Sequence, residues 1–504
     1  MVNDKNFADL HSFRLQWILL TVLGTFYFFS RLIYLDADLP PWEIANYDSI
    51  DEFYYTASAF EMVEGLGTHN RLLTSSLGWA FNSVQQLLTA TTLAVFGDNY
   101  YGLRLPSVVA GFIVLASFFI ICFDRFGPAP AFAFAALLLS EFSFTLASRT
   151  VEPTIFRMAG AALVLLHFCK LSVQESARQH VQTGLLVGAA WFLLYPTNAF
   201  LGLFGALSVL FLSETRRLAG LAYYLLGIAI SFVVYAACCI YLPDQNLSTF
   251  IHQFQPLQPR LAGTGASSLW LDVYEKLRET RSANFLQMYQ EMEYILVASV
   301  TVIFLSLVVG WRPRRADILL FLFLICFLLQ TCFVNDYPKR KLVFLYPVAL
   351  YAIVLAAALL FRAVPRRARS IAGMTLVLTS VSALATPTIW HIYANPQFEQ
   401  KMAMQSLKDI GNARLIGGWS FAFRLYNTYH PFLNKYAWIY RDAGQYYAWL
   451  HEAGERKEAE YTIEYGTMDI EAKLNEIGFF RKELILPSND ATRPNVYLYS
   501  FRGS

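Results

Sequence analysis

Long apolar runs, separated by short basic segments, occupy most of residues 15–390 and limit what this chain can fold into. Several of them approach the roughly 20 apolar residues that a helix needs to cross a bilayer. Of the 504 residues, 56% are hydrophobic and only 15% are charged. A typical soluble domain has about a quarter of its residues charged. These features predict an α-helical polytopic membrane protein.

The apolar runs correspond to about eleven predicted transmembrane helices. Their centres lie near residues 25, 113, 138, 164, 188, 205, 229, 301, 325, 351 and 379. The fifth and sixth runs are short, and the segment 193–200 between them contains Pro196 and Asn198, which mark a tight turn. Both a full crossing and a shallower hairpin fit this pattern. The first run follows Lys5 and Arg14 without a small-residue cleavage site after it, which predicts an uncleaved anchor.

A series of basic residues at successive helix ends falls on one side of the membrane. By the positive-inside rule this side is the cytoplasm, and it contains the N-terminus. These residues are Lys5, Arg14, Arg125, Lys170, Arg178, Arg216, Arg217, Arg312, Arg314, Arg315, Arg362, Arg366, Arg367 and Arg369. The external segments are then residues 36–101, 148–154, 241–290, 335–341 and 390–504. The predicted domains are a transmembrane domain, 1–390, with a large first external loop, 36–101, and a small external α/β domain, 391–504.

The tail has the composition of a soluble domain. Five segments have strand patterns, near residues 413–420, 435–440, 458–466, 482–487 and 495–501, and the amphipathic stretch 469–478 predicts a helix. From Asn395 onward thirteen acids balance thirteen bases, which argues against a nucleic-acid partner. All six cysteines lie in apolar runs, which argues against a disulfide framework and against a zinc site.

The first external loop is strongly acidic. Residues 36–101 contain nine acids and one base, Arg71. "SIDE" at 49–52 fits a capping box with Ser49 at the N-cap, so Glu52 has a structural explanation. Asp51 has no capping duty, although an acid in the first turn also suits the helix dipole. The excess of acids favours a functional role for the loop.

Two more external motifs carry charge. In "SRTVEPT", 148–154, Glu152 is either a helix-start carboxylate or a second acid that faces Asp51 across an external cavity. Arg149 beside it is a candidate ion-pair partner or anion ligand. Lys339, Arg340 and Lys341 form an external cluster that breaks the charge rule. Such a cluster suits a lipid phosphate, while headgroup anchoring is the structural alternative.

Arg104 opens the second predicted transmembrane helix, within "LRLPS". A basic residue at this depth commonly extends to the membrane surface. The alternative is that it holds a phosphate.

In this order, the acidic pair of the first loop, "LRLPS", "SRTVEP" and "RKLVFLYP" resemble the membrane-embedded C-type glycosyltransferases over roughly residues 15–390. The similarity is closest to bacterial aminoarabinose and lipid A core galacturonosyl transferases, with protein O-mannosyltransferases as distant relatives. The resemblance implies that Asp51 is the catalytic acid of the first loop and Glu152 the second acid, where many relatives have Asp. It implies substrate-binding roles for Glu52, Tyr55, Arg104, Arg149, Lys339, Arg340 and Lys341.

The predicted reaction moves a sugar from a polyprenyl-phosphate donor to a hydroxyl of an envelope glycolipid, polysaccharide or protein, with inversion, outside a bacterial inner membrane. The acceptor hydroxyl needs a base, and the departing phosphate needs cations. No metal is required, although two acids facing each other could hold a divalent cation. A transporter or lipid flippase is the first alternative, but its charges would lie near mid-bilayer. A non-catalytic envelope scaffold is the second.

Overall fold

The computed structural model describes residues 4–37, 56–64, 79–151, 153–171, 176–194, 198–212, 217–241, 313–333, 345–363, 415–416, 443–455, 461–465, 468–486 and 496–502. Nine of the predicted transmembrane centres fall on described helices, and those near residues 301 and 379 lie outside the described residues.

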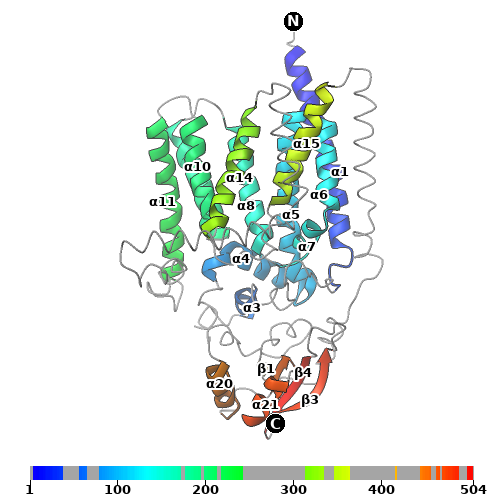
Figure 1. Ribbon diagram of the computed structural model, residues 1–504, viewed down its shortest axis with the longest axis vertical. Helices are drawn as coiled ribbons and strands as arrows, with labels where there is room; N and C mark the ends of the chain where they lie inside the picture. The colour runs from blue at the N-terminus through cyan, green and yellow to red at the C-terminus, as the bar shows by residue number, and fades with distance from the viewer. Residues whose placement is uncertain are drawn as a thin grey trace.

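The main body is a bundle of upright helices, with α3 and α4 lying across one of its ends (Figure 1). The helices are α1 (Asp4–Leu32), α3 (Ala57–Glu64), α4 (Trp79–Phe96), α5 (Tyr100–Phe126), α6 (Pro128–Ser140), α7 (Phe142–Ala147), α8 (Pro153–Lys170), α9 (Ala177–Ala189), the π-helix η2 (Ala190–Leu194), α10 (Ala199–Leu212), α11 (Arg217–Tyr241), α14 (Arg315–Phe333) and α15 (Tyr346–Ala363).

Turn chemistry sets the boundaries of α5. The Asn99 side chain accepts a hydrogen bond from Gly102 N and caps the start of the helix. Gly127, with a φ of 90°, ends it, because a left-handed backbone favours glycine. Pro128 then begins α6 at a position where its missing N–H is no loss.

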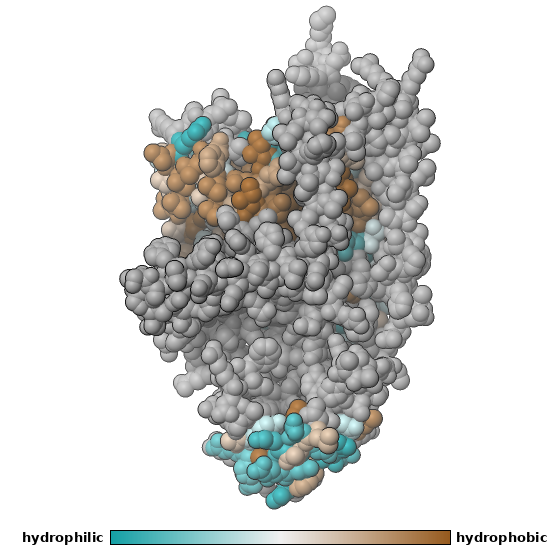
Figure 2. Space-filling model, in the orientation of Figure 1, coloured by the Kyte–Doolittle hydropathy of each residue, from teal (hydrophilic) through white to brown (hydrophobic). Residues whose placement is uncertain are grey.

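Three described helical segments are long and apolar enough to span a bilayer, namely Arg14–Leu32 of α1, all of α5, and Arg217–Ala237 of α11. Shorter apolar helical segments are Val84–Phe96, Pro128–Ser140, Ala199–Phe211 and Tyr346–Leu359. The coloured surface of the bundle is mostly hydrophobic, with a few hydrophilic patches, while the coloured tail is mostly hydrophilic (Figure 2). An apolar outer surface of this extent suits contact with lipid.

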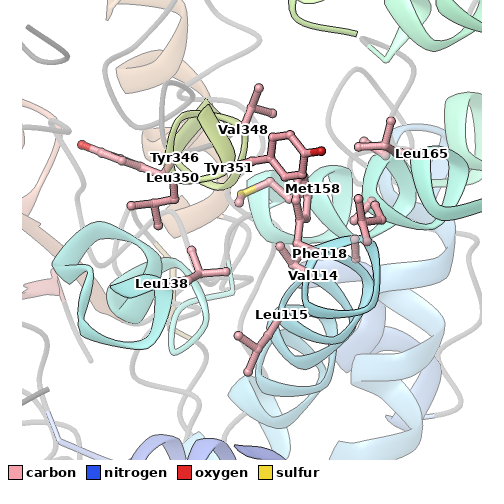
Figure 3. Packing of buried hydrophobic residues seen from close by; sticks show 14 of the residues in the cluster. Val114, Leu115, Phe118, Leu138, Met158, Leu165, Tyr346, Val348, Leu350 and Tyr351 are labelled. Atoms are coloured by element: carbon pink, nitrogen blue, oxygen red, sulfur yellow. The ribbon is translucent and has the colours of Figure 1, made fainter. Parts of the chain in front are cut away.

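The core of the bundle lies where α5 packs on α8, α6 and α15. Figure 3 shows this packing, in which aliphatic and aromatic side chains from all four helices meet. The labelled residues are Val114, Leu115, Phe118, Leu138, Met158, Leu165, Tyr346, Val348, Leu350 and Tyr351.

Small residues let α9 and α11 approach closely. A Cβ at Gly184 would collide with the carbonyl of Tyr224, and one at Gly227 would collide with the carbonyl of Val181. Close backbone contact through small residues is a common way to join helices in membranes, where lipid leaves little hydrophobic drive for association.

The described part of the tail forms a sheet with the strand order β1-β2-β4-β3. Its elements are β1 (Leu415–Ile416), α20 (Ala443–Glu455), β2 (Tyr461–Tyr465), α21 (Met468–Glu476), β3 (Phe479–Leu486) and β4 (Val496–Phe501). β1 pairs with β2 in parallel, and the other pairs are antiparallel. These strands overlap four of the predicted segments, and the predicted strand 435–440 lies outside the described residues.

Candidate active site

Arg149 holds the C-terminal end of α1. Its Nη1 donates to the carbonyl oxygens of Arg31 at 3.1 Å and Ile33 at 2.9 Å, and its Nη2 donates to that of Tyr34. The last carbonyls of a helix lack partners within the helix and carry partial negative charge, so a cation there is stabilising. Tyr34 has a φ of 51°, which is unusual for a residue other than glycine. Arg149 therefore also binds the turn in which Tyr34 has this left-handed backbone.

Arg104 binds the next carbonyls along the chain, just after those that Arg149 binds. Its Nη1 donates to the carbonyl oxygens of Leu35 and Ala37, both at 2.7 Å. Its guanidinium also lies over the Tyr100 ring, 4.0 Å from the centroid. The side chain is only 1% exposed, so it stays inside the protein and does not extend to the membrane surface.

Arg31 completes this group from the α1 side. It donates to Ser148 Oγ and Thr145 Oγ1, both at 3.0 Å, and to the carbonyl oxygen of Leu139 at 3.2 Å. We call Arg31, Arg104 and Arg149 the arginine corner, because they fasten α1 to the α5 start and to α7. Sequence analysis did not single out Arg31, because an arginine at the end of an apolar run is common.

Two adjacent glutamines of α4 reach toward both predicted acid-bearing segments. Gln86 Oε1 accepts from the backbone N–H of Ala59 at 2.9 Å, in the first turn of α3. Gln85 Nε2 donates to the carbonyl oxygen of Val151 at 3.2 Å, directly before Glu152. Both glutamines are fully buried. This pair, here called the α4 bridge, was not found by sequence analysis, because two glutamines in an amphipathic stretch give no motif.

A third buried polar contact joins α8 to the start of α10. Arg157 of α8 donates from Nε to Asn198 Oδ1 at 3.0 Å, and Asn198 Nδ2 donates to the carbonyl oxygen of Ala190 at 3.2 Å. Ala190 begins η2, which packs against α4 and α8. Single π-helical turns are rare and are frequent at functional sites. The centre of the predicted 193–200 turn lies outside the described residues, and sequence analysis did not identify Arg157.

Most of the predicted site residues lie outside the described residues. They are Asp51, Glu52, Tyr55, Glu152, Lys339, Arg340 and Lys341. Their flanks are described: α3 follows Asp51 closely, Val151 and Pro153 flank Glu152, and α14 and α15 flank the basic cluster. Arg104 and Arg149 are the described members of the predicted set, and the corner brings them together around the end of α1.

Asp98, one of the acids of the first loop, lies between α4 and α5. Burial raises the pKa of the Asp98 carboxyl above its ordinary value. Within the described ranges no three His, Cys, Asp or Glu side chains gather as a metal site would need. The described residues thus offer hydrogen-bonding amides and arginines next to the two acid-bearing segments.

The opposite end of the bundle carries several of the basic residues predicted to be cytoplasmic. Arg125 forms an ion pair with Asp317 at 2.7 Å, and Tyr351 donates to the same carboxylate at 2.8 Å. Lys170 pairs with Asp124, and Arg315 donates to the carbonyl oxygen of Leu171. The ends of α5 and α8 and the start of α14 therefore meet at one end, away from the arginine corner.

Part of the chain matches a known protein family. Residues 84–241 match the family model of dolichyl-phosphate-mannose-protein mannosyltransferases. No curated protein matches the chain by sequence.

Solved structures share the fold over nearly the whole chain. ArnT from Cupriavidus metallidurans bound to undecaprenyl phosphate is 13% identical, with a TM-score of 0.57, covering 96% of this chain and 97% of that chain. Its apo state is 12% identical, with a TM-score of 0.58 and the same coverage. The archaeal oligosaccharyltransferase AglB from Archaeoglobus fulgidus, in complex with an inhibitory peptide and a dolichol-phosphate, is 10% identical, with a TM-score of 0.50, covering 96% of this chain and 74% of that chain.

The fold is thus that of proteins which the sequence motifs independently resemble, and the family match covers α4, α5 and α8, which carry the α4 bridge, Arg104 and Arg157. This fold and the family match over residues 84–241 thus agree with the resemblance to C-type membrane glycosyltransferases that the sequence motifs carry.

Proposed function

We propose that this enzyme transfers a sugar from a polyprenyl-phosphate donor to a hydroxyl of an envelope glycolipid, polysaccharide or protein, with inversion. Transfer takes place at the end of the bundle that bears the arginine corner, which is the external face of a bacterial inner membrane. Two structures with the same fold were solved with such carriers, undecaprenyl phosphate and a dolichol-phosphate. This likeness supports the donor class.

The α4 bridge is the observation that carries the proposal. Gln86 binds the start of α3, which follows Asp51, and Gln85 binds Val151, which precedes Glu152. Two adjacent buried side chains of α4 therefore hold both acid-bearing segments. Holding two reacting groups in a fixed relation is a large part of enzymatic rate enhancement.

Asp51 acts as the base in this proposal. It takes the proton of the acceptor hydroxyl, whose oxygen attacks the anomeric carbon on the face opposite the phosphate. The bond between that carbon and the phosphate oxygen breaks, and the electron pair leaves with the polyprenyl phosphate. Glu152 orients the acceptor or Asp51, with Glu52 and Tyr55 as further substrate contacts of the same loop.

Cations are needed where negative charge develops on the departing phosphate. Lys339, Arg340 and Lys341 provide them in this proposal. Arg104 and Arg149 remain predicted substrate contacts, and their described hydrogen bonds go to the carbonyls of residues 30–37. They hold the start of the first external loop in place. The reaction requires no metal, and activity in a chelator tests this point.

The test is sugar transfer by the full-length protein in lipid discs. Labelled polyprenyl-phosphate sugars are supplied in parallel with extracted envelope lipids, and product is detected by label transfer. We expect one donor to be consumed by the wild type and spared by Asp51→Asn. Asp36→Asn, an acid at the start of the same loop, is the matched control and should stay active. A folded wild type that consumes no donor of the panel would contradict the proposal.

A further inference from the structure

We propose that Gln85 and Thr89, on successive turns of α4, bind hydroxyl groups of the carbohydrate substrate next to the Glu152 segment. The inference rests on the proposed function and adds residues that recognise the sugar. It follows from two buried polar atoms whose hydrogen-bonding capacity the described structure leaves unused.

Thr89 is the first of them. Its side chain is fully buried, and Oγ1 has no partner in the described part of the chain. A threonine within a helix can satisfy its hydroxyl on the carbonyl four residues earlier. Thr91 and Thr92 of the same helix do so, at 2.8 Å from Leu87 O and 3.0 Å from Leu88 O. Thr89 does not use the carbonyl that its own helix offers, so its hydroxyl is available to another group.

Gln85 is the second. Its Nε2 donates to Val151 O, and since a carbonyl oxygen can only accept, this contact settles which end of the amide is which. Oε1 is then the unused atom, and it is buried without a partner among the described residues. Buried acceptors are nearly always satisfied in folded proteins, so an exception calls for a physical explanation.

The two atoms lie on the same side of α4, because residues four apart on a helix are neighbours. Gln85 places that side against Val151, the residue before the proposed acid Glu152. Gln85 and Thr89 therefore lie beside the segment that carries Glu152, where the proposed reaction takes place.

The chemistry of the pair selects its ligand. Gln85 Oε1 accepts only, while the Thr89 hydroxyl both donates and accepts. A phosphate needs donors and would be repelled by the amide oxygen, and an apolar chain would leave both atoms unsatisfied. Sugar hydroxyls donate and accept at once, so they match both atoms. These hydroxyls come either from the donor's sugar or from a carbohydrate acceptor. Both atoms are shielded from solvent here, so binding involves a local opening at α4.

The experiment compares Thr89→Val with Thr91→Val in the full-length protein in lipid discs. Valine keeps the shape of threonine and removes the hydroxyl. We expect Thr89→Val to raise KM about five- to tenfold for one substrate, the loss expected for one hydrogen bond. Its melting temperature should be unchanged or higher, because no described hydrogen bond is lost. Thr89→Ser, which keeps the hydroxyl, should restore most of the affinity, and Thr91→Val should match the wild type.

The source of the hydroxyl is identified by which KM moves. A rise for the polyprenyl-phosphate sugar assigns the pair to the donor, and a rise for the envelope acceptor assigns it to the acceptor. Thermal stabilisation by the donor panel alone gives a second readout, since a ligand that binds the folded state raises its melting temperature. Thr89→Val with wild-type KM for both substrates, or a rise that Thr89→Ser shares, would overturn the inference. An inactive wild type would instead count against the proposed function.

Discussion

The carbonyl oxygen of Ile33 lies 2.9 Å from Arg149 Nη1, although 116 residues separate the two along the chain. The contact joins the segment that leads to Glu152 with the turn that starts the first external loop. Arg104 binds the next carbonyls of that turn from α5. The loop proposed to carry Asp51 thus leaves the bundle from a corner that three buried arginines hold.

Replacing Arg149 with methionine should destabilise the protein strongly. Four buried or partly buried carbonyls at and just beyond the end of α1 would lose a charged donor, and about 3 kcal/mol is expected from hydrogen bonds to a charged group. Arg149→Lys should recover little, because a single ammonium cannot reproduce the planar fork of a guanidinium. The measurement is thermal unfolding in detergent. Arg178→Gln, an exposed arginine of α9, is the control, and equal stability of Arg149→Met and Arg178→Gln would disprove the anchoring role.

Gln86→Leu should lower kcat with only a small loss of stability. The Ala59 N–H would keep its bond to Thr56 O at 2.9 Å, so about 1 kcal/mol of stability is at risk. The start of α3 would lose its hydrogen bond to α4, so Asp51, which precedes α3, would be held less precisely. Misplacing a reacting group in this way can reduce the rate about tenfold or more. Sugar transfer and melting are measured on the same preparation. Leu87→Ala, at an exposed position of α4, serves as control; a normal kcat in Gln86→Leu would argue against the α4 bridge as a positioning device.

Breaking the Arg125–Asp317 pair one residue at a time should cost about 3–5 kcal/mol, because each single change leaves an uncompensated buried charge. Arg125→Met with Asp317→Leu and Tyr351→Phe removes all three side-chain members of the group and leaves only the backbone N–H of Arg314, which donates to Asp317 at 2.9 Å, without its acceptor. This triple variant should recover most of the wild-type stability in thermal unfolding.

Lys170→Gln provides the surface comparison, since exposed ion pairs contribute about 0–1 kcal/mol. If the Arg125 and Asp317 single variants lost no more stability than Lys170→Gln, the buried pair would not contribute to stability as proposed. Because the group is far from the arginine corner, donor KM should stay unchanged in all folded variants.

Neutralising Lys339 and Lys341 to glutamine should raise KM for the donor and weaken its dependence on salt. Both effects follow if the cluster attracts the donor phosphate, because salt screens exposed charges. Lys482→Gln, an exposed lysine of β3, is the matched control. Donor KM measured at low and high salt would separate phosphate binding from headgroup anchoring, which predicts an unchanged KM.

The apolar runs by themselves determined the membrane class and the approximate position of nine described helices, because burial in lipid demands long unbroken apolar segments. Turn residues determined local boundaries in the same way, as Asn99 and Gly127 do for α5. The order of the charged motifs along the chain was sufficient to suggest the superfamily and the acids Asp51 and Glu152.

Only the tertiary structure decided what the buried polar residues do. Arg104 and Arg149 are predicted substrate ligands from the sequence, and the structure adds that both donate to carbonyls at and beyond the end of α1. Arg31, Arg157, Gln85 and Thr89 carry no recognisable motif, since their partners lie far away along the chain or are absent from the described residues. A sequence pattern indicates the local secondary structure and whether a segment lies in lipid or in water. The pairing of buried polar groups depends instead on which distant segments the packing brings together.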